Sequence, residues 1–103
     1  MSRVVWSEDA LDEFDDLVGY IAAENPPAAL AVADRIDDAV KALAAMPVGR
    51  SGRVAGTYEK VVSGLPYVIA YALGDEPRGH ETLTVLRIVH GARDGPEGQR
   101  PRE

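Results

Sequence analysis

Side chains able to assist RNA cleavage lie in the second half of this 103-residue chain, spread over several predicted strands. Such a reaction needs a base near the 2′-hydroxyl, cations that hold the phosphate and an acid for the leaving oxygen. An unperturbed histidine titrates near neutral pH, so His90 suits either proton-transfer role. The catalytic candidates are Lys60, Arg87, His90 and Arg93, with Tyr58 and Tyr71 as further candidates. The alternative for each is a place in the sheet or in a partner contact.

The last predicted strand, residues 82–90, places Arg87 inside an apolar stretch. A charged side chain there must reach solvent or a partner. Regular alternation puts Leu83, Val85, Arg87 and Val89 on one face and Thr84, Leu86, Ile88 and His90 on the other. Arg87 and His90 then point to opposite sides of the sheet, which argues against a joint catalytic site. We favour a structural or partner-binding role for Arg87 and an ordinary strand-end role for His90.

A basic, glycine-containing loop follows the helical part of the chain. Arg50 and Arg53 alternate there with Gly49 and Gly52, and glycine lets backbone amides approach a phosphate closely. The loop lacks the Lys-Ser/Thr ending of a P-loop. A phosphate site and a plain solvated connection are both open interpretations.

Composition excludes several kinds of site. The chain has no cysteine, which removes disulfides, thiol catalysis and zinc–thiolate sites. Two acidic groups, one of Asp12, Asp15 and Asp16 and one of Asp34, Asp37 and Asp38, could each share a helix face. Acids on the solvent side of an amphipathic helix are the common case, so we expect no metal and no cofactor.

The net charge of −6 is unevenly distributed. Residues 1–46 hold three basic and ten acidic residues, whereas residues 47–103 hold eight and seven. This balance argues against a dedicated nucleic-acid binder. No apolar run is long enough to span a membrane, and the first residues lack the pattern of a signal peptide. We therefore expect a cytoplasmic protein.

Hydrophobic periodicity predicts one strand, two helices and then several strands. Residues 4–6 read as a strand, Ser7 as the cap of a helix, and Asn25-Pro26-Pro27 as the junction to a second helix over 27–45. Strands follow at 57–63, 67–73 and 82–90. The order predicts an α+β domain in which an antiparallel helical hairpin covers one face of a mostly antiparallel sheet.

The strand at 67–73 has two unlike faces. Tyr67, Ile69, Tyr71 and Leu73 share one, and the smaller Val68, Ala70 and Ala72 share the other. Either face could meet the helices, leaving the other for a partner. We expect a single domain over residues 1–95 and a flexible tail over 96–103.

Several segments, in this order and spacing, together resemble one known family. They are Val5-Trp6-Ser7, Tyr20-Ile21-Ala22, Asn25 to Ala29, Gly49 to Val54 with Gly56-Thr57, Leu65 to Tyr71, and Leu86 to Arg93. The chain resembles RelE/ParE toxins over roughly residues 4–95, and the ParE branch more than the RelE branch. The resemblance implies a βααβββ fold. This sequence differs from the family's pattern at Tyr58 and Lys60, where arginine and an apolar residue are expected, and at Gly95, where a tryptophan is common.

The resemblance also implies a function. ParE-like toxins trap DNA gyrase on cleaved DNA without established catalytic residues of their own, RelE-like toxins cut messenger RNA on the ribosome, and both are neutralised by a co-encoded antitoxin. We expect gyrase as the target, a ParD-like antitoxin in a hetero-oligomer, and DNA contact only through antitoxin or gyrase. The alternatives are a ribosome-dependent mRNA interferase and a non-toxic binding module. The expected antitoxin- or target-binding residues are Arg50, Arg53, Tyr58, Lys60, Tyr67, Tyr71, Arg87, His90 and Arg93.

Overall fold

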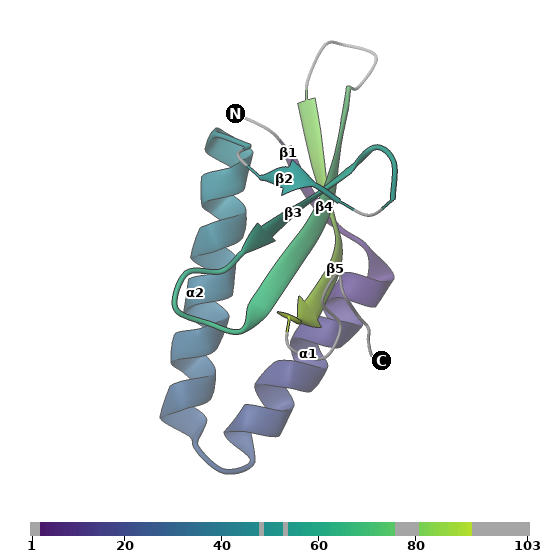
Figure 1. Ribbon diagram of the computed structural model, residues 1–103. Helices are drawn as coiled ribbons and strands as arrows, with labels where there is room; N and C mark the ends of the chain where they lie inside the picture. The colour runs from purple at the N-terminus through teal and green to yellow at the C-terminus, as the bar shows by residue number, and fades with distance from the viewer. Residues whose placement is uncertain (1–2, 48, 53, 76–80, 92–103) are drawn as a thin grey trace.

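The computed structural model describes residues 3–47, 49–52, 54–75 and 81–91. Its elements are β1 (Arg3–Trp6), α1 (Glu8–Ala22), α2 (Pro26–Ala45), β2 (Arg50–Ser51), β3 (Thr57–Val61), β4 (Tyr67–Asp75) and β5 (Glu81–His90). The predicted α+β order of strand, helical hairpin and mostly antiparallel sheet is confirmed (Figure 1). The two-residue β2 is an addition, since it forms inside the segment expected to be only a loop. Arg53, Arg93 and the expected tail over 96–103 lie outside the described residues.

Both helices begin at the caps that the sequence indicates. The Ser7 hydroxyl accepts a hydrogen bond from the backbone N–H of Ala10 at 3.0 Å. The Asn25 side chain does the same for Ala28 at 3.1 Å, and Pro26 occupies the first turn, where its missing N–H leaves no bond unmade. A junction of only three residues between the helices makes them an antiparallel pair.

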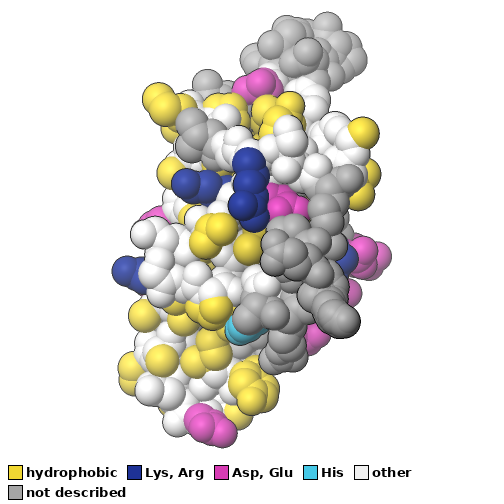
Figure 2. Space-filling model, viewed as in Figure 1, with side chains coloured by type: hydrophobic (Ala, Val, Ile, Leu, Met, Phe, Trp, Pro, Cys, Tyr) yellow, Lys and Arg dark blue, Asp and Glu magenta, His cyan; other side chains and the backbone are white. Residues whose placement is uncertain are grey.

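The five strands that the structure describes lie in the order β1-β5-β4-β3-β2. β5 therefore lies between β1 and β4, although it follows all the other described strands in the sequence. It pairs parallel with β1 and antiparallel with β4. Both helices pack behind the strands in the view of Figure 1, and Figure 2 shows the molecule from the same side.

The bulkier face of β4 meets the helices. Ile69 and Tyr71 are 0% and 1% exposed and belong to the same core as helix residues such as Ile36. The other members of this core are Ala10, Val40, Leu43, Val62, Leu83, Val85 and Ile88. Of the two unlike faces predicted for this strand, the one with the larger side chains therefore packs on the helices, because it buries more apolar surface against α1 and α2.

The expected regular alternation of β5 is wrong. Val85 pairs with Tyr71 and Arg87 pairs with Ala70, so Leu86 is an extra residue in a β-bulge. The bulge shifts the register by one, and Ile88, paired with Ile69, faces the core together with Val85. Arg87 and His90 still point to opposite faces.

Candidate functional site

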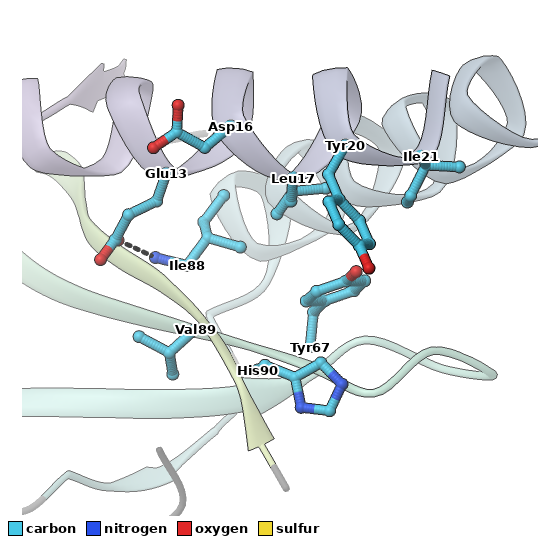
Figure 3. Close-up of a pocket in the computed structure, with 9 residues that line it drawn as sticks. All are labelled: Glu13, Asp16, Leu17, Tyr20, Ile21, Tyr67, Ile88, Val89 and His90. Atoms are coloured by element: carbon cyan, nitrogen blue, oxygen red, sulfur yellow. Dashed lines mark hydrogen bonds between the residues drawn. The ribbon is translucent and has the colours of Figure 1, made fainter. Parts of the chain in front are cut away.

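A groove lies between α1, from Glu13 onward, and the neighbouring part of the sheet, which is the start of β4 and the end of β5 (Figure 3). Its volume is about 750 Å³. The helix supplies one wall and the helix-facing side of the two strands supplies the other. The lining residues are Glu13, Asp16, Leu17, Tyr20 and Ile21 from α1, Tyr67 from β4, and Ile88, Val89 and His90 from β5.

The groove begins where β1 ends. Its last residue, Trp6, pairs with Val85, and the chain then turns into α1. Ser7 completes this turn, because its backbone N–H donates to the Val85 carbonyl at 2.9 Å and its hydroxyl donates to the Leu86 carbonyl at 2.8 Å. Among the described strands, none pairs with the rest of β5 on the side away from β4.

Glu13 occupies the edge of β5 just beyond this turn. Its carboxylate accepts the backbone N–H of Ile88 at 2.8 Å and the Nε–H of Arg87 at 2.6 Å. A second guanidinium nitrogen of Arg87 pairs with the same carboxylate. The charged Arg87 in the apolar strand thus finds a partner on α1. The Glu13 carboxylate also accepts the backbone N–H of Ile88, as a neighbouring strand would do.

Glu13 is a site residue that was not predicted from the sequence. It lies among the acids of α1, yet it is three residues after Ala10 and four before Leu17, both on the buried side of the helix. This spacing was the available signal, because residues three or four apart are neighbours on a helix. It places Glu13 at the border of the buried stripe rather than on its solvent side.

Aromatic side chains form the far end of the groove. The rings of Tyr67 and His90 meet edge to face, with centroids 5.6 Å apart and an interplanar angle of 84°. Nδ1 of His90 is buried and has no hydrogen-bond partner among the described residues. Tyr20 is 80% exposed, and it points from α1 toward Tyr67 in Figure 3. This end offers apolar ring surface together with polar atoms at its rim.

The groove is acidic. Glu13 and Asp16 line it, and no lysine or arginine does so within the described part of the chain. Six of the fifteen residues of α1 are acidic and none is basic. Because Glu13 is already paired with Arg87, the excess negative charge of this lining comes from Asp16, and it favours a cationic ligand over an anionic one.

Tyr58 and Tyr71 lie elsewhere, on the helix-facing side of β3 and β4. Their rings stack at 5.5 Å with 25° between planes. Burial raises the pKa of the Tyr71 phenol above its usual value, and the nearby Tyr58 adds to this. Tyr71 is thus placed as a core residue, whereas Tyr67 is the tyrosine of β4 that lines the groove.

Two further residues predicted as site residues, Lys60 and Arg50, lie away from the groove. Lys60 is exposed on β3 and pairs with Ile69, which in turn pairs with Ile88, so two strand spacings separate Lys60 from β5. Arg50 on β2 lies 3.7 Å from the Glu59 carboxylate. The structure brings His90 to the groove and Arg87 to its edge, and it leaves Lys60 and Arg50 outside.

Among the described residues, no group of three or more histidines and acidic residues could hold a metal ion. Neither α1 nor α2 is a candidate membrane span.

Known proteins resemble this chain over nearly its whole length. The sequence profile described as ParE toxin of type II toxin–antitoxin system, parDE, matches residues 4–95. The protein Y4kP of Sinorhizobium fredii is 34% identical over 92% of this chain and 94% of its own length. Toxin RelE2 of Caulobacter vibrioides is 35% identical over 90% and 99%. A solved chain from the chromosomal ParDE toxin–antitoxin system of P. aeruginosa shares the fold, with a TM-score of 0.76, 20% identity and coverage of 87% and 96%.

Proposed function

Because the chain belongs to the family of ParE toxins of type II toxin–antitoxin systems, we propose that it inhibits growth by poisoning DNA gyrase. A co-encoded antitoxin of the ParD kind neutralises it in a hetero-oligomer. The toxin needs no catalysis of its own in this scheme, since its effect is to hold gyrase on cleaved DNA. It meets DNA only through gyrase or through the antitoxin.

The observation that favours gyrase over the ribosome as the target is the pairing of Arg87 with Glu13. A nuclease would need this cation free to hold the scissile phosphate. Its guanidinium is instead held by the Glu13 carboxylate, and Lys60 lies two strands from His90. The net charge of −6 also disfavours tight contact with ribosomal RNA. In Figure 2 the coloured basic side chains form small, separate patches.

The second candidate function is ribosome-dependent cleavage of messenger RNA. The observation that favours it is the 35% identity to Toxin RelE2 of C. vibrioides, whose name points to the RelE branch. In that case His90 would serve as acid or base, and the cation would have to come from Lys60 or from Arg93, which lies outside the described residues.

Expression of the full chain without an antitoxin separates these functions. Gyrase poisoning predicts growth arrest, a DNA-damage response and gyrase trapped covalently on DNA. Message cleavage in ribosomes with intact DNA would instead identify an mRNA interferase. Unimpaired growth with well-folded protein would identify a non-toxic binding module and overturn the proposal. Co-expression of the antitoxin encoded beside the chain is the control, and it should restore growth.

A further inference from the structure

We propose that a hollow between the end of β1 and the two helices binds a small organic cation, a linear aliphatic polyamine. The hollow has a volume of about 370 Å³, and among the described residues it shares no lining residue with the groove beside β5. Its lining residues are Trp6 from β1, Leu11 and Phe14 from α1, and Ala33, Asp34 and Asp37 from α2.

Two aromatic rings contribute to the apolar wall of the hollow. Trp6 and Phe14 meet edge to face, with ring centroids 5.4 Å apart and an interplanar angle of 71°. Leu11 adds aliphatic surface to the same wall and is 47% exposed. Aromatic rings attract cations, and tryptophan attracts them most strongly. This wall can therefore hold an ammonium group against a ring while the methylene groups of the same ligand cover the leucine.

The other wall, on α2, carries an excess of negative charge. Asp34 and Asp37 are three residues apart on this helix, so they are neighbours on its surface. Nζ of Lys41 lies 2.9 Å from the Asp37 carboxylate. This hydrogen bond and the charge of Asp37, with smaller contributions from Asp38 and Asp34, raise the pKa of the Lys41 ammonium. One ammonium group is thus surrounded by three carboxylates.

The nearest arginine of α2 is engaged elsewhere. Nη1 of Arg35 donates to the Ser63 carbonyl at 3.2 Å, between β3 and β4. No lysine or arginine of the described residues lines the hollow. The pair of Lys41 and Asp37 is exposed on both sides, and exposed pairs contribute little to stability. A further cation can therefore join these carboxylates without the loss of a strong interaction.

The two walls together select a polyamine. A metal ion prefers a shell of oxygen ligands and would gain nothing from the aromatic and aliphatic wall. A polyamine has ammonium groups separated by short methylene chains, so one charge can lie between Asp34 and the rings while the next follows the acidic surface of α2. Because the lining comes from β1, α1 and α2, the bound ligand stabilises the packing of these three elements.

Trp6 provides a direct measurement, because it is the only tryptophan of the chain. Spermidine is titrated into the full, purified protein while tryptophan emission is recorded. We expect a saturable change in emission, NMR amide shifts centred on Trp6, Phe14 and Asp34, a melting temperature that rises with spermidine, and weaker binding at higher salt. Butylamine, with one charge, should bind several-fold more weakly. Butanediol, which has no charge, and Mg²⁺, which has no methylene chain, should give no saturable change.

Two matched variants locate the site. Asp34→Asn removes an exposed carboxylate that lines the hollow, and Glu24→Gln removes one at the junction between the helices, so the two change the net charge equally. We expect Asp34→Asn to weaken spermidine binding several-fold and Glu24→Gln to leave it nearly unchanged. Equal effects of the two variants would reveal unspecific attraction to an acidic protein and would overturn the proposal. The absence of a saturable change, an equal response to Mg²⁺, or amide shifts centred on Asp16 and His90 would overturn it as well.

The site is independent of toxicity. A chain that fails to arrest growth but binds spermidine beside Trp6 would refute the proposed function and keep the hollow as a polyamine site. A chain that traps gyrase but does not respond to spermidine would do the reverse.

Discussion

The two halves of β5 have different surroundings, although they belong to one continuous strand. The first half lies between β1 and β4, and its inward side chains, Leu83 and Val85, are fully buried. The second half has β4 on one side, and on the other side, among the described residues, it meets the Glu13 side chain of α1 and no further strand. Between them lie the end of β1 at Trp6 and the bulge at Leu86. The first half is thus enclosed by strands on both sides, whereas the second half has one strand neighbour among the described strands.

This contrast shows how a small domain can expose a strand edge without pairing indiscriminately. Exposed edges promote aggregation, and proteins commonly protect them with charged side chains. Here Glu13 covers one N–H of the edge and neutralises Arg87 beside it. One carboxylate from the helix thus covers part of this edge.

Replacement of Leu83 by alanine should produce the largest loss of stability in the enclosed half. The side chain is 0% exposed, so Leu83→Ala removes buried methyl groups and leaves a cavity. We expect the free energy of unfolding in urea to fall by about 2–5 kcal/mol. The comparison variant is Tyr20→Ala on α1, at the groove beside the open half of β5, and it should change the free energy of unfolding by no more than about 0.5 kcal/mol because this side chain is 80% exposed. A similar loss for both variants would remove the contrast between the halves.

Loss of Glu13 should destabilise the open half by a moderate amount. Glu13→Ala leaves the Ile88 N–H and the Arg87 guanidinium without this acceptor, at an expected cost of about 1–3 kcal/mol in urea unfolding. Glu13→Gln keeps an acceptor and should lose less. Hydrogen exchange at the Ile88 amide should quicken in the alanine variant, whereas an unchanged rate would show that Glu13 does not protect the edge.

The two helix caps offer a finer test of the boundary between the halves. Asn25→Ala removes one capping bond and should cost about 1 kcal/mol. Ser7→Ala removes the equivalent bond and also the bond to the Leu86 carbonyl at the bulge. We therefore expect its loss, measured by urea unfolding, to be larger by about 0.5–1.5 kcal/mol. Equal losses would mean that Ser7 does not support the bulge.

The pH dependence of stability should show the smallest effect, visible only in alkali. Burial raises the pKa of the Tyr71 phenol, so the unfolded chain releases this proton first as pH rises. The stability that depends on the neutral phenol is complete below the unfolded pKa, near 10, and is lost as pH rises through the folded value. Tyr71→Phe should remove this alkaline slope in urea titrations, while the exposed Tyr20→Phe should retain it.

The sequence predicted the elements well and the site only in part. Ser7 and Asn25 identify the helix starts, because capping is a local interaction that neighbouring residues determine. The bulge at Leu86 could not be predicted, since it depends on how β4 and β5 align and nothing in Thr84-Val85-Leu86-Arg87 distinguishes it from a regular strand. β2 was missed because two residues carry no periodicity.

The candidate site likewise contains residues that could be predicted from the sequence and one that could not. His90 and Arg87 were singled out by residue type, and Tyr67 by its position in the strand. Glu13 was grouped with the solvated acids of α1, because its partners on β5 lie 74 and 75 residues away in the sequence. Interactions over such separations require the folded chain.

The position of β5 has a consequence for the synthesis of the protein. β1 precedes both helices in the sequence, yet its partner among the described strands is β5, which follows all the others. A nascent chain that ends before Glu81 can fold its helical hairpin and join β3 to β4, but its first strand has no neighbour. The described sheet can therefore be completed only after β5 has been synthesised, because β1 pairs with that strand.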